Sequence, residues 1–289
     1  MSDRPLTVRI EHHRPEVATV VLDRPERLNA MSVHLCTDLL AALDDVSDDN
    51  VVRVVVLTGE GRGFCSGLDL DDHGILPGID GLTIPRIGPK AMRHYSRLTP
   101  ALRKVPQPII AAVNGPAYGG GMCLALGADL RIASESARFN STGIVNGLSS
   151  TELGVSWLLP RLVGAAHAND LMLTGRTIDA HEALRMGLVS RVVDDGAVLD
   201  EARAMADAMC EFSPYGLQMT KSTAWANLEV GSLEAAIELE DRNQLMLGYT
   251  DNLPEAIRAR NQSRPPRYSD QPRDLGTADT TDWIPDAGE

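Results

Sequence analysis

Two glycine-rich turns are the parts of this chain best suited to chemistry. The first, residues 59–70, reads GEGRGFCSGLDL and follows VVRVVVLT, a β-branched run that predicts a buried parallel strand. The second, residues 114–129, reads NGPAYGGGMCLALGAD; it follows a short apolar run and leads into an apolar helix. Glycine lets other groups approach the backbone, and a helix N-terminus carries unpaired N–H groups and partial positive charge. Two such turns that each point one N–H at the same oxygen would stabilise an enolate or a tetrahedral oxyanion, whereas either turn alone is equally well explained by packing.

These motifs resemble the crotonase (enoyl-CoA hydratase/isomerase) superfamily. The matching segments are GRGFCSGLDL at 61–70, NGPAYGGGMCLALGADLRIAS at 114–134, LLPRLVG at 158–164 and LTGRTIDAHEALRMGLVSRVV at 173–193. Their order and spacing agree with the family from about residue 8 to residue 264. The resemblance implies an α/β fold, with a repeated β-β-α core and a C-terminal helical trimerisation region. It also implies an acyl-CoA substrate whose enolate oxygen is held by the backbone N–H groups of Leu68 and Gly120.

The proton chemistry departs from that of the family's hydratases. The resemblance places their two catalytic glutamates at Cys123 and Gly143, and neither residue is a carboxylate that can do general acid/base work. Cys123 lies in the apolar run MCLALG, which predicts a buried and inert thiol. Glu152 falls where the superfamily's dienoyl-CoA isomerases carry a proton-shuttling carboxylate. An apolar acyl pocket would raise its pKa toward neutrality; a helix cap or a surface glutamate is the structural alternative.

Three functions fit these observations. The first is an isomerase-like acyl-CoA enzyme that uses the two amides and Glu152. The second is a hydratase in the broad sense, with a water positioned by other groups. The third is a non-catalytic acyl-CoA binder that keeps the amides and has lost the proton chemistry. Membership of the family does not choose among them.

Further substrate contacts are implied by the same resemblance. The residues expected to bind the substrate and its CoA group are Arg27, Ser66, Leu68, Asp69, Leu70, Gly120 and Gly143. Arg27 lies in a polar loop that follows the CoA nucleotide in the family, with Arg24 a weaker candidate, and surface arginines beside a turn are the alternative. Residues 71–89 are irregular and are expected to shape the acyl pocket. His73, inside that segment, either faces the pocket or is an exposed loop histidine.

Composition excludes several other classes. The net charge of −13 argues against nucleic acid as a partner. The four cysteines have no metal-like or CxxC spacing, and no stretch is apolar enough to span a membrane, so we expect a cytoplasmic protein with no membrane partner. No cofactor is expected, because the CoA thioester is the substrate, and no metal ligand set is present. We expect a homotrimer or a dimer of trimers.

The predicted organisation has three parts. Residues 1–200 form the acyl-CoA-binding core, residues 201–262 a C-terminal helical region, and residues 263–289 an extended or disordered tail that is poor in apolar side chains. Within the core, strands are expected at 6–13, 16–22, 51–58 and 109–113. Helices are expected at 32–46 and 91–104, and also directly after each glycine-rich turn.

Overall fold

The computed structural model describes residues 5–72 and 74–273, which form two compact units. The first unit extends to Cys210 and the second begins at Glu211. The sequence placed this boundary ten residues earlier. The difference arises because helix α7 (Val198–Met209) buries Val198, Ala202 and Ala206 against the sheet of the first unit.

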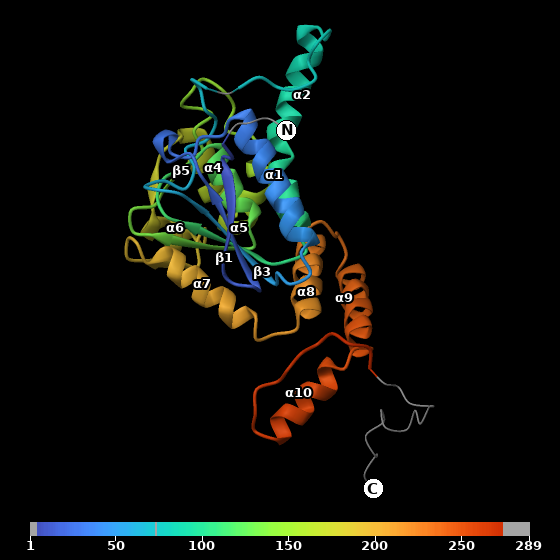
Figure 1. Cartoon of the computed structure of the whole chain (residues 1–289). Helices are drawn as coiled ribbons and strands as arrows, with labels where there is room; N and C mark the ends of the chain where they lie inside the picture. Colours follow the sequence, from blue (N-terminus) through green and yellow to red (C-terminus); the bar gives the residue numbers. More distant parts are fainter. Residues whose placement is uncertain (1–4, 73, 274–289) are drawn as a thin grey trace. The chain divides into compact units, whose positions relative to one another are not determined.

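A six-stranded sheet runs through the first unit (Figure 1). Its strands, in spatial order, are β1 (Val8–Arg14), β2 (Val17–Leu22), β3 (Val54–Gly59), β4 (Ile109–Val113), β6 (Leu130–Ser134) and β9 (Arg191–Val193). β1 and β2 pair antiparallel, and every other neighbouring pair is parallel. All residues of β2, β3 and β4 are buried, as their nearly continuous apolar sequences predict. The four strands expected from the sequence are therefore present, with ends shifted by up to three residues.

Helices cover the sheet and position its loops. Helix α1 (Val33–Asp48) begins after Ser32, whose hydroxyl accepts a hydrogen bond from the Leu35 N–H, so the predicted N-cap is confirmed. Helix α4 (Gly120–Gly127) is wholly buried and follows the second glycine-rich turn as expected. Asp129, just after α4, accepts a hydrogen bond from the Ile109 N–H at 2.7 Å and so has a structural role.

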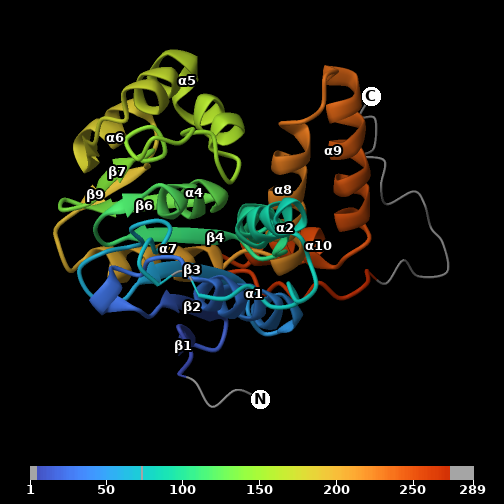
Figure 2. The ribbon, with the colours of Figure 1, turned by 90° about the horizontal axis from the view of Figure 1, so that it is seen from above.

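A second, three-stranded sheet adjoins α4. It consists of β5 (Ala117–Tyr118), β7 (Arg138–Asn140) and β8 (Ile178–Asp179). Figure 2 shows α5 (Val155–Thr174) and α6 (Ala180–Met186) on the side of α4 away from β1. The chain bends within α5 at Gly164, and Asp179 caps α6 by accepting from the Glu182 N–H at 2.7 Å. These elements place the loop that carries Glu152 beside the start of α4.

The segment after the first glycine-rich turn differs from expectation. Among the described residues, no helix begins directly after Leu70. The next helices are α2 (Ile84–Ser96) and α3 (Leu98–Lys104), whereas the sequence predicted a single helix over residues 91–104. The Asp69 carboxylate accepts hydrogen bonds from the N–H groups of Asp71 and Asp72, as a helix N-cap does. No helix follows this cap, because Gly74, at φ +80°, takes the chain out of helical geometry. Pro85 is tolerated in α2 because it occupies the first turn, where its missing N–H has no helical partner.

The second unit contains three helices among its described residues: α8 (Pro214–Asn227), α9 (Leu233–Gly248) and α10 (Asn252–Asn261). The chain beyond α10 is extended and is held by Asp270, which accepts from the Ser213 hydroxyl at 2.7 Å and pairs with Asn252. The described part of the predicted tail is thus extended, and residues 274–289 lie outside the described structure. None of the helices in the described ranges is long and apolar enough to cross a lipid bilayer.

Candidate active site

The two glycine-rich turns pack directly on each other. A Cβ atom on Gly67, where φ is +92°, would lie 2.8 Å from the Tyr118 carbonyl oxygen and 3.5 Å from the Gly120 amide nitrogen. A Cβ on Gly121 would lie 2.0 Å from the Cys65 carbonyl oxygen. The Tyr118 N–H donates to that same carbonyl at 3.0 Å. Glycine is therefore required at 67 and 121, because the two backbone segments leave no room for a side chain.

Backbone hydrogen bonds orient the amide of Leu68. The Met31 N–H donates to the Gly67 carbonyl at 2.7 Å, and the Met31 carbonyl accepts from the Asp69 N–H at 3.1 Å. Leu68 lies between these two bonds, so its own N–H does not take part in the backbone pairing with Met31. Gly120 begins α4, where N–H groups have no intrahelical acceptor. Neither the Leu68 nor the Gly120 N–H donates to another group within residues 5–72 and 74–273.

A cavity of about 580 Å³ brings these groups together. Leu68, Gly120 and Glu152, the three residues predicted to be catalytic, all line it. Most of the remaining lining is apolar and comes from residues 70–79 and from α2. The polar side chains among its described lining residues are those of Asp69, Tyr95 and Glu152. Burial raises the pKa of Tyr95 to about 12, so its hydroxyl stays protonated at physiological pH.

The part of α2 in this wall was missed by the sequence analysis. Ile87, Ala91, Met92 and Tyr95 line the cavity. The spacing of 87, 91 and 95 is that of one helix face, and this signal was present in the sequence. Pro85, Gly88 and Pro89 interrupt that pattern, and they favour an irregular chain up to residue 89 when the sequence is considered alone. The expectation that residues 71–89 border the pocket is consistent with the lining at Gly74, Ile75, Leu76 and Ile79.

Glu152 is a half-buried acid beside the start of α4. Its Oε1 lies 3.3 Å from the position that a Cβ on Gly119 would occupy, and the Thr142 hydroxyl oxygen lies 2.6 Å from the same position. Gly119 also has φ +50°, so both its backbone conformation and the lack of space for a side chain favour glycine at this position. Burial raises the pKa of Glu152, and no ion pair or hydrogen bond engages its carboxylate in the described part of the chain. It is placed to take or give a proton inside the cavity.

Asp69, the other acid in the cavity wall, is held in ion pairs. Its side chain is 1% exposed, and its carboxylate lies 3.0 Å from the Arg24 guanidinium and 2.7 Å from that of Arg27. The hydrogen bonds from Arg27, and those from Arg24 and two backbone N–H groups, hold the pKa of Asp69 well below its usual range. Asp69 is therefore a fixed anion that ties the loop at 24–31 to the turn at 60–72. Its side chain does not act as a proton carrier.

A second, more polar cavity of about 270 Å³ adjoins the first. The two share Leu68, Asp69 and Leu70, and the second is also lined by Arg27, Arg62 and Ser66. The structure thus gathers five of the predicted binding residues around one opening. Arg27 is partly neutralised there, because it pairs with Asp71 as well as with Asp69. Arg62 was not singled out from the sequence; it is exposed and makes no ion pair with any described residue.

The positions of the hydratase glutamates hold no acid. A Cβ on Gly143 would lie 2.1 Å from the Ser149 carbonyl oxygen, so a glutamate there would require the loop to move. Gly143 is absent from the described lining of both cavities, although its neighbour Thr142 packs beside Gly119. Its assignment to the substrate site stays a prediction. Cys123 is 1% exposed, and burial raises the pKa of its thiol well above the ordinary value, as expected of an inert cysteine. His73 lies outside the described residues.

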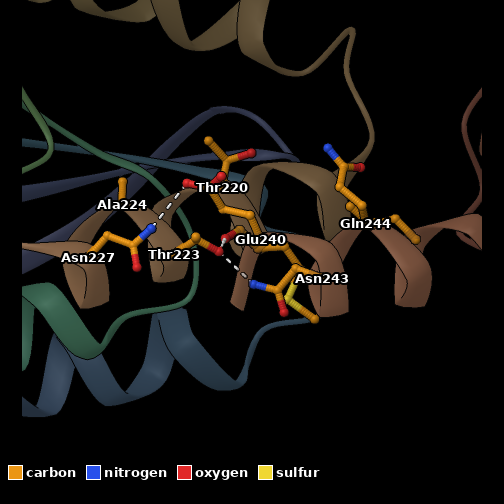
Figure 3. A pocket seen from close by; sticks show the side chains of 9 residues that line it. Thr220, Thr223, Ala224, Asn227, Glu240, Asn243 and Gln244 are labelled. Atoms are coloured by element: carbon orange, nitrogen blue, oxygen red, sulfur yellow. Dashed lines mark hydrogen bonds between the residues drawn. The ribbon is translucent and has the colours of Figure 1, made fainter. Parts of the chain in front are cut away.

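Another cavity, of about 270 Å³, lies between α8 and α9 (Figure 3). Its polar side chains bond to one another: Asn243 donates to the Thr223 hydroxyl at 2.5 Å and Asn227 donates to the Glu240 carboxylate at 3.1 Å. It contains none of the predicted site residues. Across the described ranges, no group of three or more His, Cys, Asp or Glu side chains is arranged to bind a metal ion.

Known proteins are similar to this chain in sequence and in fold. A family model described as enoyl-CoA hydratase/isomerase matches residues 12–271. A probable enoyl-CoA hydratase of Mycobacterium bovis is 49% identical over 264 residues, covering 91% of this chain and 93% of the relative. A 1,2-epoxyphenylacetyl-CoA isomerase of Escherichia coli is 36% identical, covering 90% of this chain and 97% of the relative. The crystal structure of a probable enoyl-CoA hydratase/isomerase from Mycobacterium abscessus superposes with a TM-score of 0.88 at 45% identity, covering 92% of this chain and all of the other. The chain therefore belongs to the enoyl-CoA hydratase/isomerase family, within the crotonase superfamily.

Proposed function

We propose that this acyl-CoA enzyme moves a carbon–carbon double bond along an enoyl-CoA thioester, with Glu152 as the proton carrier. One observation carries the proposal. Of the two acids in the described lining of the larger cavity, Asp69 is locked in ion pairs and Glu152 is not. A standard hydratase would need a second acid, and Cys123 and Gly143 stand in the places that the family uses.

The two free amides supply the electrostatic part of the mechanism. The thioester oxygen accepts hydrogen bonds from the N–H groups of Leu68 and Gly120, and the partial positive charge at the start of α4 lies on the same side. Negative charge builds on that oxygen as an enolate forms. The amides are held in place by neighbouring backbone bonds and by the glycine contacts, so they need little reorganisation during the reaction.

The proton step then requires a single base. In a 3-enoyl thioester the Glu152 carboxylate removes a proton from C2, and the electron pair delocalises over the thioester oxygen and the C3–C4 double bond. The protonated Glu152 returns the proton to C4, and the double bond now joins C2 and C3. No water is consumed and no redox partner is needed. The raised pKa of Glu152 suits both halves of this transfer.

The CoA group extends from Leu68 into the smaller cavity. Arg27, Ser66 and Arg62 line this cavity and offer a cation, a hydroxyl and a second cation to the phosphates and the pantetheine arm. Because Asp69 and Asp71 take part of the charge of Arg27, we assign the larger share of phosphate attraction to Arg62. The acyl group occupies the apolar wall formed by residues 70–79 and α2.

The second unit supports the proposed homotrimer or dimer of trimers. No residue of α9 is buried, although the helix carries Leu233, Ile237, Leu245 and Met246. Exposed apolar side chains on one element favour an interface. Sedimentation at micromolar concentration is expected to show a trimer or hexamer, and a monomer at that concentration would contradict the assignment.

The test of function uses two substrates. Incubation of 3-hexenoyl-CoA with the protein is expected to produce the absorbance of the conjugated 2-enoyl thioester. Crotonyl-CoA, which is already conjugated, should keep its absorbance, whereas a hydratase would abolish it. Micromolar binding of both thioesters without turnover across a range of chain lengths would instead establish the alternative, a non-catalytic acyl-CoA binder.

A further inference from the structure

Tyr95 brings to the acyl cavity a hydroxyl that the proposed mechanism does not use. The residue lies on α2 and lines the larger cavity, and its side chain is half-buried. Burial raises the pKa of Tyr95 to about 12, so the hydroxyl keeps its proton at physiological pH and can donate a hydrogen bond. It makes no hydrogen bond to any residue in the described ranges. The described lining therefore contains a donor that still needs an acceptor.

The Tyr95 side chain is held in a defined position. Its neighbour His94 is buried, and the His94 Nε2–H donates to the Val33 carbonyl of α1 at 3.0 Å. The Tyr95 and His94 rings pack edge-to-face, with their centroids 5.6 Å apart. Figure 1 shows α1 and α2 side by side, and the His94 bond joins them. The hydroxyl is thus a fixed feature of the cavity wall.

A plain hydrocarbon chain would leave this hydroxyl without a partner. In the free protein, solvent reaches the cavity past Ile75 and Met92, which line it and are 80% and 61% exposed. An acyl group that fills the cavity displaces this solvent. Tyr95 donates to neither Asp69 nor Glu152, the acids of the described lining. A donor that is desolvated and left unbonded costs roughly 1–3 kcal/mol, so the cavity favours an acyl group that supplies an acceptor.

That acceptor is a neutral oxygen. No Lys, Arg or His is among the described lining residues of the cavity, so a carboxylate on the acyl group would be desolvated without a cation. Glu152 is ionised when the proposed reaction begins, and a second negative charge near it would be disfavoured. A hydroxyl or a carbonyl oxygen accepts from Tyr95 without either penalty.

The cavity has room for such a substituent. At about 30 Å³ for one liquid water molecule, its volume of about 580 Å³ corresponds to roughly 19 groups of that size. This volume lies within the range of pockets that hold drug-sized ligands. A six-carbon acyl group would fill only part of it, so the cavity suits a longer or bulkier group.

We propose that the acyl group of the substrate has more than six carbons and carries a hydroxyl or keto oxygen that accepts a hydrogen bond from Tyr95. Tyr95 is then a specificity-determining residue that selects oxygenated acyl groups over plain ones. The inference rests on the proposed position of the acyl group in the larger cavity, and it adds no step to the double-bond migration. A site built to hydrogen-bond a substrate oxygen discriminates against the analogue that lacks it, because the protein's own polar group is left unpaired.

Saturated thioesters test the assignment without turnover, because they have no double bond to move. Decanoyl-CoA and hydroxydecanoyl-CoA isomers, with the hydroxyl at each carbon from C5 to C10, are titrated into the full chain by calorimetry. At the matching carbon, the hydroxyl is expected to tighten binding about tenfold. Tyr95→Phe should reduce this advantage to less than about twofold, and it should bind decanoyl-CoA at least as tightly as wild type, since no donor is left unpaired.

Tyr249→Phe is the matched control. Tyr249 is 58% exposed and is absent from the described lining of both cavities, so this variant should keep the hydroxyl preference. Circular dichroism confirms that both variants are folded. The inference would be overturned if no hydroxyl position improved wild-type binding, or if the advantage survived in Tyr95→Phe.

Failure of this inference is distinct from failure of the proposed function. Turnover of 3-hexenoyl-CoA by a protein that shows no hydroxyl preference would contradict the role of Tyr95 and leave the double-bond migration in place. A Tyr95-dependent preference in a protein that turns over no 3-enoyl thioester would support the role of Tyr95 and contradict the proposed reaction.

Discussion

The Gly120 amide nitrogen lies 3.5 Å from the point where a Cβ atom on Gly67 would stand. These two glycines come from turns that are 53 positions apart in the chain, and their contact sets the distance between the Leu68 and Gly120 N–H groups. The proposed oxyanion hole depends on that contact. Alanine at position 67 tests it, because the added methyl group would press on the Tyr118 carbonyl oxygen at 2.8 Å.

We expect Gly67→Ala to lower kcat at least about tenfold, since small misplacements of donors are costly in catalysis. Steady-state kinetics with 3-hexenoyl-CoA provide the measurement. Gly196→Ala is the matched control: Gly196 also has a positive φ, of +85°, but nothing lies within 4 Å of its added Cβ. Both changes should cost about 1–2 kcal/mol in backbone strain, and only the first should affect turnover. Equal kcat in the two variants would show that the packing of the turns does not matter.

Glu152→Gln removes the proton carrier and keeps nearly the same shape. We expect kcat to fall about 10²–10⁴-fold while the affinity for a non-reactive acyl-CoA changes little. Glu135→Gln, an exposed glutamate outside both cavities, serves as the control and should retain full activity. Wild-type turnover by the Glu152 variant would assign the proton transfer to another group.

The pH dependence of the rate should report the raised pKa of the partly buried Glu152 carboxylate. Its pKa is raised by desolvation, and the reaction begins with the ionised form. The value of kcat/KM should therefore fall on acidification at a pH above the ordinary glutamate value of about 4.3. An acid limb at or below that value would contradict the assignment.

Stability provides an independent check on the same group. The folded state binds the Glu152 proton more tightly than the unfolded state does, so ionisation lowers stability as pH rises through the interval between the two pKa values. Glu152→Gln should consequently be more stable than wild type near neutral pH, and the difference should shrink below about pH 4. Urea unfolding at several pH values measures it, and a difference that grows on acidification would be the wrong sign.

Breaking the Asp69 ion pairs should destabilise the turn that carries Leu68. Asp69→Asn removes the buried carboxylate partner of the Arg24 guanidinium at 3.0 Å, while the exposed Asp72 carboxylate still pairs with Arg24 at 3.1 Å. We therefore expect a loss of about 1–3 kcal/mol in the free energy of unfolding. Because the pKa of Asp69 lies well below its usual range, this contribution is complete above about pH 4 and constant up to neutrality. A double-mutant cycle with Arg24→Met measures the coupling. Additive effects of the two changes would show that the pair does not act as a unit.

Cys123 is expected to be unreactive. Its thiol is 1% exposed and its pKa is raised well above the ordinary value, so little thiolate is present at neutral pH. Cys123→Ala should keep turnover within about threefold of wild type, because a small buried change leaves the amides in place. Rapid inactivation by iodoacetamide that maps to Cys123 would show that the thiol is accessible and would reopen its role.

The sequence predicted best the elements whose hydrophobic pattern is local. The β-branched run at 51–58 and the apolar helix after the second turn were found because their patterns are local. Glu152 and the two amides were located by resemblance, and the structure places all three at one cavity. Gly143 was assigned to the substrate site in the same way; the Ser149 carbonyl packs against it and it is not among the described lining residues of that cavity, so this assignment stays a prediction.

Features that depend on distant parts of the chain were not predictable. Arg24 and Asp69 are 45 positions apart, and no local signal in either loop indicates that they form a buried pair. The cavity-lining face of α2 is different, because the four-residue spacing of Ile87, Ala91 and Tyr95 is visible in the sequence. It was obscured by Gly88 and by two prolines, which weaken a helix pattern without excluding a helix whose first turn holds one of them.

The most direct test of the mechanism is a crystal structure with a bound, non-reactive acyl-CoA thioester. The thioester oxygen is expected to lie about 2.7–3.1 Å from the amide nitrogens of both Leu68 and Gly120, with the Glu152 carboxylate facing the acyl carbons. A thioester oxygen turned toward solvent, or bonded to other groups while those amides point elsewhere, would contradict the mechanism.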